Sequence, residues 1–439
     1  MKKGNIIGAF IFVIVLAVTI LVYMVSVSSD ESSENMPANV PAVVKPETKA
    51  QDKAVVDVYW DATSSMAGYA TISNGNLYKN LPDNLEDVAS SLGEVHFFKF
   101  GKEVTPLQDR EHRNFSNPGY HTEIVTSVHN VVSNADPEHV SVIVTDLYED
   151  AADLGNISKN IREKYFSNHE AVAIIGIRNP FDGTIYDIGL SANKINYNSG
   201  NDASKYRPFY LLILGPENNV AAFLQKWKNR NVDGFDIQYV MLTENIIGKS
   251  TNLANMKLLA EDTQNLLRNE VLPIEDNRIK QYELDSMDDE AVLVAEFTYK
   301  PGLGSCTFDI DNLKYETKVM YSENGEWLPV DTGKNVSIEL QEKEDDKYQV
   351  TVKFLPRDVL EKGKINFLHI ELIPGEEGLK LPDWISSWTL PNINLDAASF
   401  DGTKTVNFNR FVENLKDEVM GSQPVIVNMD MVINAKEGW

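Results

Sequence analysis

The stretch AVVDVYWDATSSMAG, residues 54–68, decides the fold that we expect for this chain. Its first half is rich in β-branched and aromatic residues, which is typical of a strand buried on both faces of a sheet. From Asp61 on it carries hydroxyl side chains and reaches a glycine, which is typical of a loop. Ligands of open α/β sheets bind beyond the carboxyl ends of strands, so this loop is the first place to look for a site.

Similar strand-like runs follow and alternate with segments that have helical spacing. This alternation predicts an α/β domain over residues 54–245, with helices around a doubly wound, mostly parallel sheet. Residues 179–208 are too long and too polar for a plain connection, and we interpret them as an insertion with one hairpin. The expected strands are 54–60, 94–100, 139–146, 171–177, 209–215 and 235–242, and the expected helices are 85–92, 122–135, 157–166 and 218–230.

The pattern changes after this domain. Residues 246–283 predict one or two connecting helices up to Val271, broken at Pro273. Residues 284–376 carry short alternating strands separated by turns, which predicts an antiparallel β-sandwich of immunoglobulin-like form. The remaining residues, 377–439, predict loop, one helix near 409–419 and a final strand at 424–434. The sandwich strands are expected at 291–299, 315–322, 335–342, 347–355 and 365–373.

The amino terminus predicts a membrane anchor over residues 1–29. An apolar run over residues 6–27 exceeds the roughly 20 helical residues that span a bilayer core. Lys2 and Lys3 precede it, which favours a cytoplasmic amino terminus and an extracytoplasmic body. A cleaved signal peptide is the alternative, although its apolar part is usually only about 7–15 residues long. Residues 30–53 contain three prolines and no aromatic residue, so we expect a disordered linker.

Composition excludes several classes of function. The chain has 439 residues and a net charge of −25, and 43% of its residues are hydrophobic, as in a globular protein. Such an acidic chain is a poor partner for nucleic acid, whose phosphates reward a basic surface. Cys306 is the one cysteine, which excludes an intramolecular disulfide and a cysteine-based zinc site. The seven histidines show no metal-binding spacing.

Oxygen-bearing side chains gather where the predicted strands end. Asp61, Thr63 and Ser65 alternate along the loop after the first strand, so their side chains can face one point. Thr122 opens an expected helix and Asp146 closes the strand at 139–146. Hydroxyl and carboxylate oxygens are the donors that hard cations such as Mg²⁺ prefer. The pattern therefore predicts a site for Mg²⁺, with Mn²⁺ and Ca²⁺ as alternatives.

The motif Asp61-x-Thr63-x-Ser65-Met66-x-Gly68 resembles the metal-ion-dependent adhesion site (MIDAS) of von Willebrand factor type A (vWA) domains. The resemblance covers about residues 54–245 and suggests a membrane-anchored protein of bacterial type. It implies that the cation is held directly by Thr63, Ser65 and Thr122, with Asp61 and Asp146 acting through water or coordinating variably. It also implies that an acidic group of a protein partner completes the shell.

Two departures from the family pattern affect partner binding more than the fold. Thr63 stands where the family usually has serine, which keeps the hydroxyl and stiffens the side chain. Leu147 follows Asp146 where glycine is common, and Glu149 and Asp150 come next. These two carboxylates either help to hold a cation or repel an acidic partner.

Local explanations remain open for several of these residues. Serine and aspartate also stabilise turns and helix ends, and Thr122 would serve as a plain N-cap. His121 either approaches the site or is a surface loop residue. A phosphatase-like role of Asp61 as a nucleophile would need a second aspartate two positions later, where this chain has Thr63. Trp384 and Trp388 form either an aromatic docking patch or a packing contact with a neighbouring domain.

The sequence thus predicts a membrane-tethered, extracytoplasmic binding protein that uses a divalent cation for adhesion to a protein partner and is not an enzyme. Catalysis would need a positioned acid or base, and none stands out. A metal-dependent envelope hydrolase and a structural envelope scaffold with a degenerate metal site are the alternatives.

Overall fold

The computed structural model describes most of the chain after residue 52. The described ranges are 53–73, 75–147, 151–188, 193–230, 234–243, 253–274, 277–299, 306–330, 335–344, 346–375, 377–391, 400–421 and 425–435. The expected anchor at 1–29 and the expected linker at 30–53, except its last residue, lie outside these ranges. None of the described helices combines the length and the apolar composition needed to cross a membrane.

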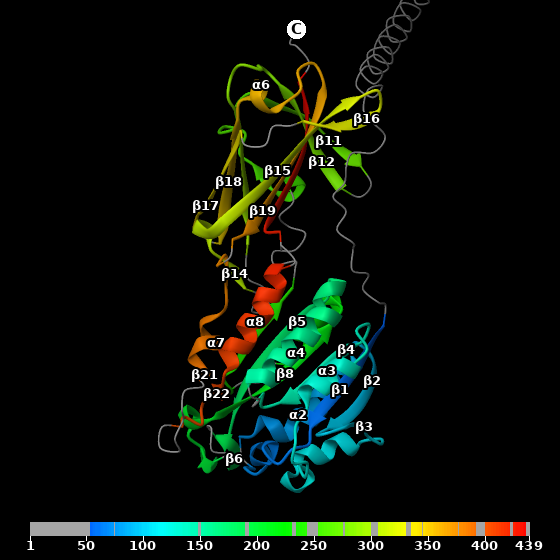
Figure 1. The fold of residues 1–439 in the computed structure, drawn as a ribbon, viewed down its shortest axis with the longest axis vertical. Coiled ribbons are helices and arrows are strands. Elements are labelled where there is room, and N and C mark those ends of the chain that lie inside the picture. Colours follow the sequence, from blue (N-terminus) through cyan, green and yellow to red (C-terminus); the bar gives the residue numbers. More distant parts are fainter. Residues whose placement is uncertain are drawn as a thin grey trace, which may run out of the picture.

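The amino-terminal body is built on a seven-stranded sheet (Figure 1). Along this sheet the strand order is β3-β2-β1-β4-β8-β5-β9. Strand β1 runs parallel to β2 and to β4, whereas the other neighbouring pairs are antiparallel. The strands are β1 (Ala54–Asp61), β2 (Gly93–Phe100), β3 (Val104–Pro106), β4 (Val140–Thr145), β5 (Ala171–Asn179), β8 (Arg207–Gly215) and β9 (Ile237–Leu242).

The sheet is therefore mixed, and the expectation of a mostly parallel sheet is wrong for its second half. The cause is the expected insertion, which forms a hairpin of β6 (Asp182–Ile188) and β7 (Asn193–Asn198). Because the chain returns from this hairpin at the end where β5 left, β8 runs back beside β5, with Asn179 opposite Arg207. Strands buried on both faces have the same apolar pattern in either direction, so the sequence pattern does not distinguish them.

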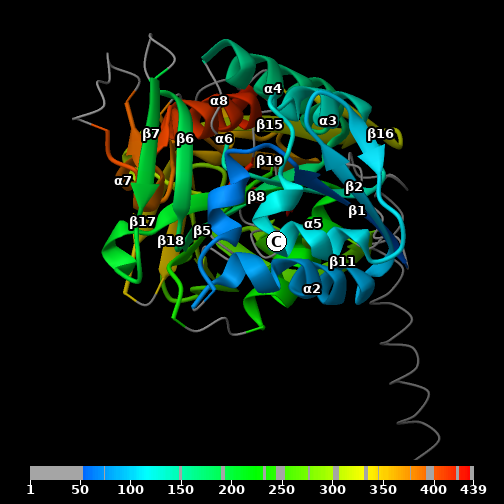
Figure 2. The same cartoon turned by 90° about the horizontal axis from the view of Figure 1, so that it is seen from below.

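Helices cover both faces of this sheet (Figure 2). Helices α2 (Leu77–Ser90) and α5 (Glu217–Lys228) share one hydrophobic cluster with Val56 and Val58 of β1. Helices α3 (Val128–Asn134), α4 (Ala151–Lys164) and α8 (Phe408–Gly421) pack with Tyr59 on the other face. Alternate residues of one buried strand thus pack into two separate apolar layers, one on each face of the sheet.

The second body holds a four-stranded sheet, β10-β13-β18-β17, and a six-stranded sheet, β11-β12-β23-β19-β15-β16. Most of their buried residues belong to one hydrophobic cluster, while Ile279, Ile365, Phe367 and Val432 form a separate small cluster on the six-stranded sheet. The expected strands of this region are confirmed as β13, β15, β17, β18 and β19. The strands are β10 (Lys257–Leu258), β13 (Ala291–Thr298), β17 (Val336–Glu342), β18 (Lys347–Phe354), β11 (Leu266–Ile274), β12 (Asn277–Leu284), β15 (Leu313–Glu323), β16 (Glu326–Pro329), β19 (Ile365–Pro374) and β23 (Val427–Asn434).

Short elements complete this body: β14 (Thr307–Phe308) pairs with β20 (Leu379–Lys380), and helix α6 (Pro356–Val359) follows β18.

The connecting helices expected within 246–283 are wrong for the described part of that range. Residues of β11 and β12 form an antiparallel pair instead, and β11 lies at the edge of the six-stranded sheet. An edge strand tolerates Pro273, because a strand with one open side can spare the missing backbone donor. The proline that looked like a helix breaker therefore lies inside a strand.

The carboxy-terminal residues connect the two bodies. After β20, helix α7 (Asp383–Ser387), strands β21 (Thr389–Leu390) and β22 (Thr405–Val406) and the expected helix, α8, pack on the amino-terminal body. The ring of Phe408 stacks on Tyr210 of β8 with 4.5 Å between centroids. Strand β23 then returns to the second body between β12 and β19 (Figure 1).

Trp384 and Trp388 are buried in this contact and form no exposed docking patch. They lie against Gly176 of β5, where an added Cβ would meet the Trp388 ring at 2.8 Å. The indole of Trp384 also donates to the carbonyl of Tyr239 at 3.2 Å. The structure thus favours the packing explanation of this tryptophan pair.

Candidate functional site

The parallel pairing of β1 with β4 brings two carboxylates to the same edge of the sheet. Trp60 pairs with Val144, so Asp61 and Thr145 follow at matching positions where the two strands end. Asp146 comes directly after β4, and both aspartates are buried. The expectation that these strand ends meet is confirmed.

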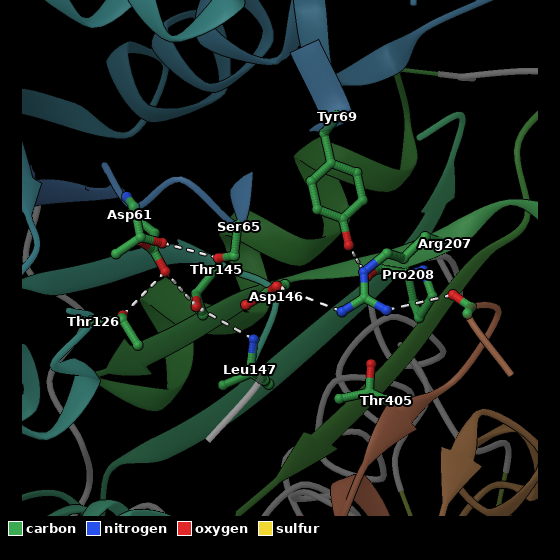
Figure 3. Close-up of polar contacts among 12 residues, drawn as sticks. Asp61, Ser65, Tyr69, Thr126, Thr145, Asp146, Leu147, Arg207, Pro208 and Thr405 are labelled. Atoms are coloured by element: carbon green, nitrogen blue, oxygen red, sulfur yellow. Dashed lines mark hydrogen bonds and ion pairs between the residues drawn. The ribbon is translucent and has the colours of Figure 1, made fainter. Parts of the chain in front are cut away.

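Asp61 is fully hydrogen-bonded at this edge. Its Oδ1 accepts from the backbone N–H of Thr63 at 2.9 Å and from the Thr63 hydroxyl at 2.6 Å. Its Oδ2 accepts from the hydroxyls of Thr126 at 3.1 Å and of Thr145 at 3.0 Å (Figure 3). These four bonds use about the full acceptor capacity of a carboxylate, so Asp61 acts on its surroundings mainly by orienting hydroxyl groups.

Thr63 and Ser65 lie side by side in the loop after β1. Their hydroxyl oxygens are 3.0 Å apart, and the 3-10 helix η1 (Met66–Ala70) begins directly after Ser65. A second loop fixes this one, because the backbone N–H of Ser64 donates to Glu123 and that of Glu123 donates to Ala62, both at 3.0 Å. The alternating positions of the motif therefore do bring two hydroxyls together.

Thr122 does not join this group. Its side chain is exposed, and α3 begins only at Val128, so Thr122 is not the helix head that the sequence predicts. The residues between His121 and Val128 lie outside the helix, and Glu123 among them forms an isolated parallel bridge with Thr63. Thr126, four residues later, donates to Asp61 in the place expected for Thr122. Thr122 and Thr126 both belong to the stretch TEIVT, and the sequence alone does not show which of them lies next to the helix start.

Arg207 is the main residue that the sequence analysis missed. Its side chain is 1% exposed, and its Nη2 lies 3.6 Å from Oδ2 of Asp146. Its Nη1 also donates to the carbonyl of Gly402 at 3.5 Å (Figure 3). Because β8 runs antiparallel to β4, its first residue lies at the edge where β4 ends. In the expected parallel arrangement Arg207 would have been at the opposite edge.

Leu147 adopts the left-handed backbone region, with φ at 51°. Its N–H donates to the Thr145 hydroxyl at 3.3 Å, and its side chain is buried. Residues other than glycine rarely adopt this conformation, which costs of order 1 kcal/mol. Glu149 and Asp150, the other departures noted in the sequence, lie outside the described residues.

Burial dominates the electrostatics of this edge. Burial and the neighbouring charge of Asp146 raise the pKa of Asp61 to about 6, against the lowering effect of its hydrogen bonds. Burial lowers the pKa of His121 to about 4, so this imidazole is neutral near pH 7. It faces the carbonyl of Phe115 at 3.2 Å. His121 is thus a buried residue and not the surface loop histidine that its position suggested.

Chemically, the site offers an oxygen-only set of donors. The hydroxyls of Thr63 and Ser65, the hydroxyl of Thr126 and the carboxylate of Asp146 are the groups suited to a hard cation. Among the described residues, no group of three histidine, cysteine, aspartate or glutamate side chains is arranged to hold a metal ion.

The loop after β1, the loop before α3 and the start of β8 thus meet around two buried aspartates. A scan against models of known protein families gives no match for this chain, and a search of the curated proteins gives none either.

Proposed function

We propose that this chain is a membrane-tethered, extracytoplasmic binding protein that holds a divalent cation at the Asp61 edge and engages a protein partner through it. The cation is Mg²⁺, with Mn²⁺ or Ca²⁺ as substitutes. The partner offers an acidic group to the cation, and the chain catalyses no reaction. In finer terms we propose a vWA-like, doubly wound amino-terminal domain followed by an immunoglobulin-like β-sandwich.

The observation that carries this proposal is the spacing of two hydroxyl oxygens. Oγ1 of Thr63 and Oγ of Ser65 are hydrogen-bonded to each other at 3.0 Å. Two oxygens at right angles around an octahedral Mg²⁺, each about 2.1 Å from the ion, are separated by about 3.0 Å. The hydrogen bond from Thr63 to Asp61 turns the lone pairs of that hydroxyl away from the carboxylate. The pair is therefore compatible with adjacent positions in one coordination shell.

Two further features support the resemblance to an adhesion site. Thr126 provides a third hydroxyl from a separate loop, in the role that the resemblance had given to Thr122. Leu147 has a positive φ at the position where the family commonly has glycine, so the backbone keeps a conformation that glycine would adopt without cost. A residue held in this region despite its side chain is a feature that clusters at functional sites.

Arg207 modifies what the site does. Its positive charge beside Asp146 offsets part of the negative charge that would attract a cation. The carboxylate of Asp146 is also held in place by this contact. We therefore expect cation affinity to be weaker than that of a site with two uncompensated aspartates, and an acidic partner group to be repelled less.

Calorimetric titration of Mg²⁺, Mn²⁺ and Ca²⁺ into the full chain, kept in detergent because of its apolar amino terminus, tests the cation site. We expect one saturable site per chain, abolished by Thr63→Ala combined with Ser65→Ala. Ser64→Ala is the matched control, because Ser64 lies between the two but contributes its backbone N–H to the loop contact. Equal binding by wild type and the double variant would show that the motif is only a strand-end turn.

A further inference from the structure

Lys280 of β12 is a buried amine with no carboxylate beside it. The residue is 3% exposed, and its Nζ donates to the carbonyl of Met256 at 3.2 Å. Within the part of the chain that the structure describes, no ion pair joins this group and no carboxylate acts on its charge. An ammonium group loses its hydration inside a protein, so lysine is almost never fully buried unless it is paired. The charged form of Lys280 is therefore poorly stabilised where it lies.

Two further polar side chains lie on the same face of the six-stranded sheet. Tyr282 follows Lys280 by two positions along β12, and its hydroxyl is buried without a hydrogen-bond partner among the described residues. Arg268 of the edge strand β11 pairs directly opposite Tyr282 and is exposed. A bulge follows Arg268 directly, and such bulges re-aim side chains and are common beside functional sites. A buried amine, a buried hydroxyl and a guanidinium thus lie together near one edge of the sheet.

The electrostatics of this group favour a neutral amine. Burial and the charge of Arg268 lower the pKa of Lys280 to about 8. About a tenth of the Lys280 amines are then neutral at pH 7, against about three in ten thousand for a lysine at the ordinary 10.5. The neutral amine is a nucleophile, whereas the guanidinium of Arg268 and the hydroxyl of Tyr282 are donors suited to an anion. The surroundings of Nζ therefore disfavour a cation and favour an anion.

We propose that Lys280 is a site of reversible carbamate formation with carbon dioxide. The Nζ lone pair attacks the carbon, one C=O electron pair moves to oxygen, and a proton leaves the nitrogen for water. A carbamate anion thereby replaces the ammonium group, with no oxidation or reduction. Tyr282 donates a hydrogen bond to a carbamate oxygen, and Arg268 offsets the new negative charge.

Carbon dioxide suits the position of this amine. The molecule is neutral and has three atoms, so it enters an apolar interior without the cost of burying a charge. Strand β11 alone separates β12 from the edge of the sheet. The carbamate ties this edge strand to its neighbour through Arg268, and a ligand that is held by the folded state raises its stability. The site lies in the second body and does not depend on the cation proposed at the Asp61 edge.

Carbon-13 nuclear magnetic resonance of the full chain in detergent, equilibrated near pH 8 with labelled carbon dioxide, tests the site. The α-amino group of the chain, whose ordinary pKa is about 7.7–8.0, also forms a carbamate and provides an internal reference. We expect a second carbamate resonance in the wild type. Lys280→Met and Lys280→Arg should lack it and keep the reference, because a guanidinium stays protonated at this pH. The reference resonance alone in the wild type, or a second resonance that persists in both variants, refutes the proposal.

Variants that retain Lys280 test the two donors without removing the amine. Tyr282→Phe and Arg268→Gln should each raise the carbon dioxide concentration for half-occupancy about tenfold, because each removes a hydrogen bond to a charged group. Tyr315→Phe is the matched control, since it removes an exposed hydroxyl from the same body, and its half-occupancy should stay at the wild-type value. Wild-type half-occupancy in both Tyr282→Phe and Arg268→Gln would overturn the arrangement that we propose.

Discussion

Replacing Thr126 by valine tests the most specific feature of the site, the hydroxyl that reaches Asp61 from a second loop. Valine keeps the shape of threonine and removes only the hydroxyl. A hydrogen bond to a charged group contributes about 1.5–3 kcal/mol to stability. The bond is 3.1 Å long and its donor is half-buried, so we expect a loss near the lower limit, about 1.5 kcal/mol. The same change removes one oxygen of the proposed cation shell.

Thr122→Val in the same loop is the control. Thr122 is exposed, and substitutions at such positions usually change stability by less than about 0.5 kcal/mol. Urea unfolding of the full chain, followed by the fluorescence of Trp60 and the other tryptophans, measures the free energy of unfolding. Repeating the unfolding in Mg²⁺ measures the stabilisation by the bound cation, since a ligand at 100 times its Kd stabilises the folded state by about 2.7 kcal/mol. We expect Thr126→Val to reduce both the free energy of unfolding and its increase in Mg²⁺, and Thr122→Val to change neither. If Thr122→Val has the larger effect, or if the two variants behave alike, the reassignment from Thr122 to Thr126 is wrong.

Two further predictions concern charged groups. Arg207→Met removes a buried positive charge 3.6 Å from Asp146, so we expect Mg²⁺ to bind about tenfold more tightly and the fold to lose about 3–5 kcal/mol. Arg207→Lys keeps the charge and should keep the wild-type Mg²⁺ affinity in calorimetry; weaker binding by Arg207→Met would contradict this reasoning. In the second body, burial alone would lower the pKa of His369, but a hydrogen bond to Asp430 at 2.7 Å and the carboxylate of Glu371 at 3.5 Å raise it to about 9, above the ordinary 6.5. The resulting stabilisation, about 3 kcal/mol at most, is complete below pH 6.5 and is lost as pH rises through 9, and His369→Gln should flatten that slope in urea unfolding at a series of pH values.

The sequence located the strands better than it determined how they pair. The apolar run at 209–215 is found as β8, but its burial on both faces carries no information about its direction. Direction depends on the hairpin of β6 and β7, whose polar residues gave only a general signal of an insertion. The run at 266–274 has the same ambiguity, since short apolar segments with a proline fit a broken helix or an edge strand. Both errors come from information that only the tertiary structure holds.

In the candidate site too, the residues grouped by local sequence were found, and the one placed by the reversed direction of a strand was not. Asp61 ends strand β1, and Thr63 and Ser65 follow it, so their local spacing was sufficient to group them. Asp146 was found because β4 pairs with β1 in parallel, as expected. Arg207 could not have been found, because its position at this edge depends on the reversed direction of β8.

The path of strand β23 has a consequence for how the chain is made. This strand fills the centre of the six-stranded sheet, where Lys280 pairs with Met431 and Phe367 with Val432. During synthesis β12 and β19 emerge long before their common neighbour, and until then each has an unpaired side. Such open strand edges recruit other chains, and contacts between residues far apart in sequence form slowly. The nascent second body is therefore the part most exposed to misassembly, and a chain that stops before residue 427 would retain that open gap permanently.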